Sequence, residues 1–181
     1  MSISKGRMFK RVGFFHFGHD HDDPIGSLRK ALEEAAEVSD SLIVLPEAFN
    51  IGKKYRENGR DPDFSPRVLD HLQGIARTRG ISFVAGLIID DARGVAPPYS
   101  SAYYIDRDIE RLLCRKGEDD GARVNYTAFG PDGCDINNPI ERKDACIAAM
   151  VCMDIDMQER YKDLASKTAS SSQPIRVFCV T

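Results

Sequence analysis

The sequence lacks any apolar run long enough to cross a bilayer, and its basic residues are scattered among acidic ones rather than clustered. A membrane-spanning helix needs about 20 consecutive apolar residues, and the first residues also lack the apolar core of a signal peptide. Nucleic-acid-binding domains usually carry a basic patch, whereas the formal net charge here is −3. We therefore expect a cytoplasmic protein with no membrane partner and no nucleic-acid partner.

No two of the five cysteines stand in a CxxC pair. Disulfide frameworks use even sets of cysteines, and thiolate zinc sites use closely spaced pairs. Neither kind of site is therefore predicted, and the thiols are expected to be reduced. The cysteines are Cys114, Cys134, Cys146, Cys152 and Cys179. Three of them, Cys114, Cys146 and Cys179, lie inside apolar runs and are interpreted as core residues.

The 181 residues, 42% of them hydrophobic, are enough to bury a core, so residues 1–181 are expected to form a single domain. Apolar stripes at helical spacing predict helices over residues 27–38, with Ser27 as the N-cap, over residues 65–79, and more weakly over 157–169. Short apolar runs predict strands at 11–17, 41–45, 81–89, 144–152 and 175–180 and a hairpin over 101–116. Residues 117–143 are interpreted as a long loop. This order predicts an α/β fold with mixed sheets, in which the strand at 144–152, apolar on both faces, is central.

Three chemically reactive side chains each follow an apolar strand: Glu47 after "LIVLP", Lys116 after "ERLLCR" and Cys152 after "CIAAMV". Strand ends can converge at one edge of a sheet, where open α/β folds place their sites. A cation beside a thiol lowers the pKa of the thiol, a carboxylate can take its proton, and the thiolate can attack a carbonyl or nitrile carbon. The three residues together are sufficient for acyl transfer.

The segments "LIVLPEAF", "LLCRK" and "AAMVCMDID" resemble, in order and context, the Glu, Lys and Cys motifs of the nitrilase or carbon-nitrogen hydrolase superfamily. The resemblance extends from about Lys10 to the end of the sequence. It implies an αββα sandwich that assembles as a homodimer. It also implies that the second sheet lacks C-terminal strands, because family members continue beyond the strand "IRVFCV" and this sequence stops at Thr181.

The same resemblance implies the roles of the site residues. Cys152 would be the nucleophile, Glu47 the general base, and Lys116 with the backbone N–H of Met153 the oxyanion donors. The implied activity is hydrolysis of a small amide, or a nitrile or N-carbamoyl compound, to an acid and ammonia through a Cys thioester, without metal or cofactor. Glu118 and Glu141 are weak matches for a further family glutamate, and Asp154 completes a Cys-x-Asp motif.

Other interpretations stay open at this stage. Each site residue taken alone could be structural: a buried thiol, a loop carboxylate or a solvated lysine. The chain could be a catalytically inactive, shortened nitrilase-like module for binding or assembly, its open sheet edge paired with another chain, or a piece of a longer protein. The segment "HFGHDHDD" contains potential metal ligands but no standard zinc spacing, so it is interpreted as a solvated connection.

Overall fold

The computed structural model describes residues 9–16, 23–35, 37–51, 67–89, 99–115, 138–142, 145–151 and 158–180. Within these ranges, strands and helices alternate in the first half and strands predominate in the second. In chain order, they are β1 (Arg11–Phe14), α1 (Pro24–Glu34), β2 (Ser41–Leu45), α3 (Arg67–Arg79), β3 (Ser82–Ile89), β4 (Tyr99–Ile105), β5 (Glu110–Arg115), β6 (Ile140–Arg142), β7 (Ala145–Val151), α4 (Gln158–Thr168) and β8 (Ile175–Val180).

The strands form two mixed sheets, as the sequence predicts. The first sheet has the order β1-β2-β3-β4-β5, with β1, β2 and β3 parallel and β4 and β5 antiparallel to their neighbours. The second has the order β6-β7-β8, in which β7 pairs antiparallel with β6 and parallel with β8. The predicted central position of the apolar strand at 144–152 is confirmed.

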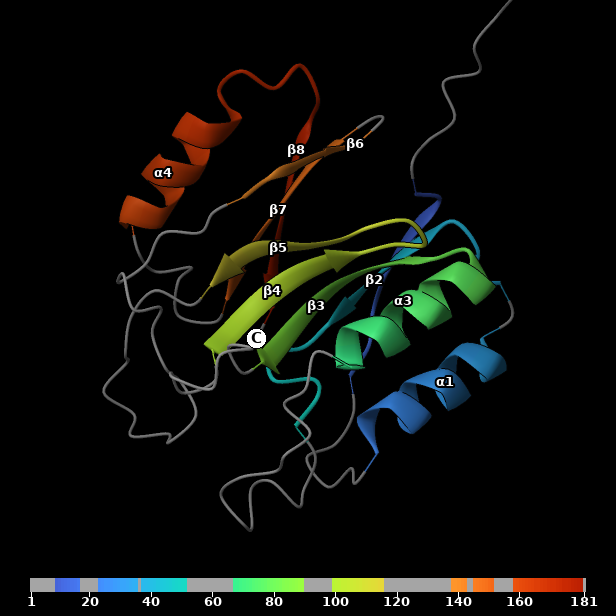
Figure 1. The fold of residues 1–181 in the computed structure, drawn as a ribbon. Coiled ribbons are helices and arrows are strands. Elements are labelled where there is room, and N and C mark those ends of the chain that lie inside the picture. The colour runs from blue at the N-terminus through green and yellow to red at the C-terminus, as the bar shows by residue number, and fades with distance from the viewer. Residues whose placement is uncertain are drawn as a thin grey trace, which may run out of the picture.

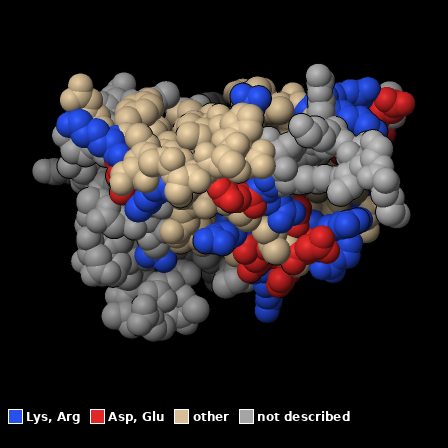
Figure 2. All heavy atoms as spheres, turned by 90° about the horizontal axis from the view of Figure 1, so that it is seen from above, with Lys and Arg blue, Asp and Glu red and all other residues tan. Residues whose placement is uncertain are grey.

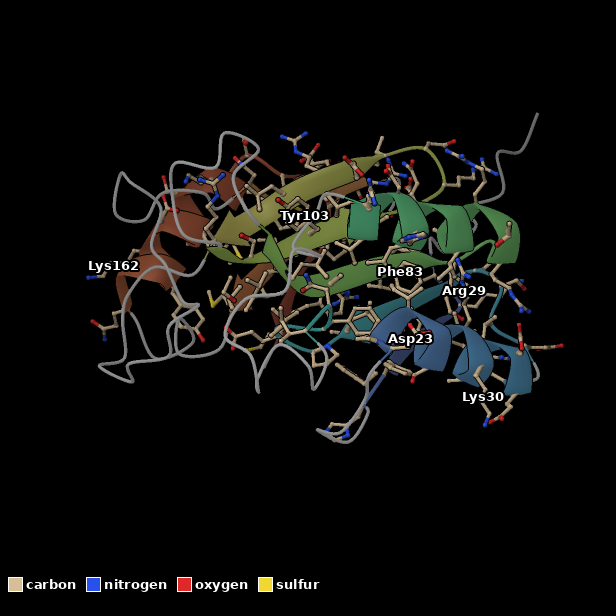
Figure 3. The ribbon with its side chains drawn as sticks, turned by 60° about the horizontal axis from the view of Figure 1, so that its bottom comes forward. Asp23, Arg29, Lys30, Phe83, Tyr103 and Lys162 are labelled. Carbon is tan, nitrogen blue, oxygen red and sulfur yellow. The ribbon has the colours of Figure 1, made fainter. Side chains whose placement is uncertain are left out.

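Helices α1 and α3 cover one face of the first sheet (Figure 1). Their apolar stripes, which include Leu28 of α1 and Leu72 of α3, bury against side chains that β2 and β3 present to this face. Phe83 of β3 is fully buried in this cluster and lies beneath the two helices in Figure 3. Side chains alternate between the faces of a strand, so the intervening residues of the same strands point to the opposite face.

That opposite face packs against the second sheet. One buried cluster joins Val44, Val84 and Tyr104 of the first sheet to Ile147 and Val151 of β7. Leu164 of α4 contacts the outer face of β7. The layers are therefore helix, sheet, sheet and helix, and the predicted αββα sandwich is confirmed.

The start of the first helix differs from the prediction. The N-cap is Asp23 rather than Ser27: its carboxylate accepts a hydrogen bond from the Gly26 N–H at 2.8 Å, and Pro24 occupies the first helical turn. Proline at this position is already in the helical range of φ and lacks an N–H that would need a partner. Ser27 lies inside the helix, its N–H donating to the Asp23 carbonyl at 3.0 Å. Figure 3 shows Asp23 where α1 begins.

Strand β1 carries exposed apolar side chains on the inter-sheet face. Val12 and Phe14 are paired in register with Leu42 and Val44, which face the second sheet, yet they are 49% and 76% exposed. Phe14 is therefore an aromatic strand residue that lies outside the core. Among the described strands, the second sheet packs against β2 to β5 of the first sheet and leaves these two side chains of β1 exposed.

A buried polar cluster ties the two sheets together where β4 ends. The Asp106 carboxylate is 5% exposed and accepts hydrogen bonds from the N–H groups of Asp108 and Ile109, at 2.8 and 2.9 Å. Its other oxygen accepts from the Tyr104 hydroxyl at 3.2 Å and from the guanidinium of Arg142, which belongs to β6 in the second sheet. One carboxylate thus closes the β4–β5 turn and also joins the sheets.

Burial raises the pKa of two hairpin tyrosines, Tyr103 and Tyr104, above the usual value of 10.0. In each case removal of the phenol from water is the largest cause, because it disfavours the charged phenolate. The hydrogen bond with Ser82 acts in the opposite direction on Tyr104.

In the part of the chain that the structure describes, no helix is long and apolar enough to cross a membrane. On the face shown in Figure 2, lysine and arginine lie among aspartate and glutamate rather than forming a separate patch.

We predict that Asp106→Ala lowers the free energy of unfolding by about 3 kcal/mol, because the buried hydroxyl of Tyr104 and the partly buried guanidinium of Arg142 lose their acceptor. The matched control is Asp108→Ala in the same turn, whose exposed ion pair with Arg107 should contribute less than about 1 kcal/mol. Urea unfolding of both variants measures the difference. Equal losses in the two variants would show that Asp106 is not a tie between the sheets.

Candidate active site

Glu47 begins a tight turn directly beyond the carboxyl end of β2, where the sequence places it. Pro46 ends the strand, and residues 47–50 form the turn. The turn includes Ala48 at φ 56°, a left-handed conformation that is uncommon for a residue other than glycine. The Glu47 residue is half-buried, so its carboxylate lies at a boundary between the protein interior and solvent.

The turn that carries Glu47 is held against β3 by hydrogen bonds. The N–H of Phe49 donates to the carbonyl of Gly86 at 2.9 Å. The Asn50 side chain makes two bonds with the backbone of Ile88: its amide donates to the carbonyl at 2.6 Å, and its oxygen accepts from the N–H at 2.9 Å. The backbone around Glu47 is therefore fixed by its neighbouring strand.

Gly86 permits this close approach. A Cβ atom added at Gly86 would lie 2.7 Å from the Pro46 carbonyl oxygen and 2.7 Å from the Glu47 Cα. These neighbours are backbone atoms and cannot rotate away. The absence of a side chain on β3 at this point is thus a condition for the position of Glu47.

The Glu47 carboxylate also has a buried side-chain partner. The hydroxyl of Ser100, a residue of β4 that is 1% exposed, donates to Oε1 of Glu47 at 2.7 Å. Ser100 was not predicted from the sequence. One feature could have drawn attention to it: Ser100 is a polar residue of β4 on the same face as Ala102 and Tyr104, which are buried in the inter-sheet cluster.

The predicted residues Lys116, Cys152 and Met153 lie outside the described residues, as do Glu118 and Asp154. The strands that lead to them are described. β5 ends at Arg115, immediately before Lys116, and β7 ends at Val151, immediately before Cys152. Near these ends, Cys114 and Val151 share the inter-sheet cluster with Val44 of β2.

The strand directions show which ends of the sandwich meet. Arg142 pairs with Ala145, the first residue of β7, and contacts Asp106 just after the end of β4. β7 therefore begins where β4 ends, and it runs toward the end where β4 begins and where Ser100 lies. Arg115 pairs with Ser101 at that same end, and Figure 1 shows the arrowheads of β3 and β5 on one side of the molecule. The described strand ends thus gather around Glu47 and Ser100.

Glu141 is not brought to this end. It is exposed on β6 and pairs with Cys146, near the start of β7. Cys146 precedes the last residue of β7 by five positions, which corresponds to about 16 Å along a strand. The structure therefore separates Glu141 from Glu47.

The other cysteines and the described part of the histidine-rich segment do not add to the candidate site. Cys114 and Cys146 are buried, as expected for core residues, whereas Cys179 is half-buried. Of the histidine-rich segment only His16 and Asp23 are described, and Asp23 caps α1. Among the described residues, no group of three or more His, Cys, Asp or Glu side chains could hold a metal ion.

A groove on the helical layer is separate from the Glu47 end. It lies between α1 and α3 and is lined by Arg29, Gly74 and Arg79, among others. In Figure 3, Arg29 lies on the side of α1 that faces α3. The first sheet stands between this groove and the inter-sheet cluster, so the groove belongs to a different face from the candidate site.

The sequence profile described as "Carbon-nitrogen hydrolase" matches residues 19–170 of this chain. The chain belongs to the carbon-nitrogen hydrolase family. The match includes the strands before Glu47, Lys116 and Cys152 and the helices on both sides of the sandwich, so the resemblance read from three short motifs is confirmed across most of the chain.

Solved structures of carbon-nitrogen hydrolases share the fold. A CN-hydrolase superfamily protein from Xanthomonas campestris matches with a TM-score of 0.57 and 17% identity, over 78% of this chain and 51% of that one. A nitrilase superfamily member from Saccharomyces cerevisiae matches with a TM-score of 0.56 and 20% identity, over 79% and 52%. A mutant amidase from Nesterenkonia sp. AN1, with acrylamide added at its active-site cysteine, matches with a TM-score of 0.67 and 19% identity, over 93% and 66%.

This member of the family thus spans about half the length of the first two solved relatives. Among curated proteins, none matches the sequence.

We predict that Gly86→Ala destabilises the protein by about 1 to 3 kcal/mol, the usual cost of forcing extra volume into a packed position. It should also increase hydrogen exchange at the Phe49 amide, which bonds to Gly86. The matched control is Gly74→Ala in α3, where an added Cβ meets no atom within 4 Å. Alanine should stabilise that helix by up to about 1 kcal/mol. Unchanged exchange at Phe49 in Gly86→Ala would contradict the close approach of the Glu47 turn to Gly86.

Proposed function

We propose that this chain provides the catalytic residues of a thiol-dependent hydrolase that cleaves the C–N bond of a small amide, or of a nitrile or N-carbamoyl compound. The single observation that carries the proposal is the Glu47 carboxylate, held by Ser100 at the end of the sandwich where β5 and β7 lead to Lys116 and Cys152. Family membership supports the same assignment. So does the mutant Nesterenkonia amidase, in which acrylamide is added at the active-site cysteine.

In the proposed first half-reaction, Glu47 accepts the thiol proton of Cys152 and the thiolate attacks the carbonyl carbon of the amide. A C–S bond forms and the carbonyl π electrons move to oxygen. The ammonium group of Lys116 and the N–H of Met153 stabilise this oxyanion; such donors typically contribute about 3 to 4 kcal/mol each. The oxyanion then collapses, the C–N bond breaks, and the proton held by Glu47 passes to the nitrogen, so that ammonia leaves.

In the second half-reaction, Glu47 acts as general base on a water molecule, which attacks the thioester carbon. The C–S bond breaks, and the proton returns to sulfur as the carboxylic acid leaves. One difficult hydrolysis is thereby divided into two easier steps. The scheme uses side chains and backbone only, so we propose no metal and no organic cofactor.

A second candidate function is assembly without catalysis, and the exposed inter-sheet face of β1 favours it. Phe14 is 76% exposed on the face that the second sheet covers elsewhere, and β8 is the last strand of the described second sheet. Large exposed apolar side chains beside an open strand edge are typical of interaction surfaces. On this alternative, the chain associates with a second copy or with another chain, and the cysteine has no role in chemistry.

The test is to incubate the full chain with acetamide, propionamide and benzamide, and to follow ammonia release and the mass of the intact protein. We expect ammonia release by the wild type and an acyl adduct on Cys152. Glu47→Gln should lower kcat by about 10² to 10⁴-fold, as loss of a general base does, and Lys116→Ala by about 10² to 10³-fold, as loss of an oxyanion donor does.

Cys152→Ala should abolish both the adduct and turnover. Cys179→Ala is the control for a thiol outside the proposed site and should retain them, since Cys179 is a half-buried residue of β8. An adduct that survives Cys152→Ala contradicts the assignment of Cys152 as the nucleophile. A wild type that forms no adduct and releases no ammonia with any of the three amides contradicts the proposed hydrolase and favours assembly without catalysis.

A further inference from the structure

The fixed backbone of Glu47 does not by itself orient the carboxylate. The turn is bound to β3 through Phe49 and Asn50, so the Cα of Glu47 has little room to move. The glutamate side chain still has three rotatable bonds between Cα and its oxygens. A general base must lie within hydrogen-bond reach of the proton it takes, so a further contact is needed to orient the carboxylate.

Ser100 makes such a contact from a rigid element. Its hydroxyl has a single proton, which it donates to Oε1 of Glu47 at 2.7 Å. Ser100 is 1% exposed and pairs with Ile88 in the regular β3–β4 register. Because a strand inside a sheet moves less than a loop, the position of this donor is defined by the fold rather than by solvent.

Ser100 lies on the inter-sheet face of β4, together with Ala102 and Tyr104 of the buried cluster between the sheets. Its neighbour Ser101 has the opposite orientation: it is 2% exposed and pairs with Leu87, which belongs to the cluster beneath the helices. Two equally buried serines thus stand side by side on one strand, and they face different layers of the sandwich.

We propose that Ser100 is the positioning residue for the general base of this enzyme. Its hydroxyl holds Oε1 of Glu47 and thereby orients the carboxylate that acts as the base toward the thiol in the proposed reaction. This inference rests on the proposed function. Ser100 does not touch the substrate in this scheme; it acts through Glu47.

The test measures thiolate formation separately from turnover, using acrylamide as a probe. The sulfur of Cys152 forms a bond to the β-carbon of acrylamide, and the α-carbon takes up a proton. Intact mass gives the rate constant of this addition and its final amplitude, and ammonia release from the best amide of the panel gives kcat and KM. The variants are Ser100→Ala, Ser100→Thr and Ser101→Ala, each with a thermal unfolding curve.

We expect Ser100→Ala to lower both kcat and the rate constant of acrylamide addition by about 10 to 100-fold, the usual effect of losing a residue that orients a functional group. KM and the labelling amplitude should stay close to the wild-type values. Ser100→Thr, which keeps the hydroxyl, should restore most of both rates, and Ser101→Ala should match the wild type.

The outcomes separate the hypotheses. A purely structural role would reduce the labelling amplitude of Ser100→Ala, because fewer molecules fold, at an unchanged rate constant; this result overturns the proposal. Wild-type rates in Ser100→Ala overturn it while leaving the hydrolase intact. A wild type that neither labels at Cys152 nor releases ammonia overturns the proposed function, and the role of Ser100 with it.

Discussion

Strand β7 is buried on both faces, and every layer of the sandwich is placed relative to it. Ile147 and Val151 point into the cluster shared with the first sheet, whereas Ala148 and Met150 contact Leu164 of α4. A strand with no polar face can satisfy its backbone only by pairing on both edges and its side chains only by packing on both sides. Once β7 is central, the end of the sandwich at which Cys152 follows it is also determined.

The apolar interior between the sheets has a polar contact at each end. One of them joins the two sheets, and the other holds the Glu47 carboxylate. Where β4 ends, Asp106 joins the β4–β5 turn to Arg142 of the second sheet. Where β4 begins, Ser100 bonds to Glu47, which lies at the boundary with solvent. The first contact sets how the sheets lie on each other. The second holds the Glu47 carboxylate at the end of the sandwich where β7 ends, immediately before the proposed nucleophile Cys152.

Much of the fold could be predicted because its signals are local. The strands at 41–45, 81–89 and 144–152 are apolar runs, and α3 ends before Gly80, whose φ of 65° suits glycine. The start of α1 was predicted wrongly at Ser27, because Asp23 and Ser27 are both good caps and only Pro24 distinguishes them. Ser100 was not predicted at all. A serine in a strand carries no local sign that its hydroxyl will bond to a glutamate 53 positions earlier.

The sequence alone determined the order of the layers, the family and the identity of the three residues proposed for catalysis. The signals for these are local: the alternation of strands and helices, the apolar runs and the short motifs each lie within neighbouring residues of the chain. The tertiary structure alone decided which groups meet. It placed Ser100 against Glu47 and Gly86 against the turn, separated Glu141 from that end, and left Phe14 exposed on β1. These outcomes depend on register and on how far one sheet extends over the other, and both are set by packing between segments distant in the chain.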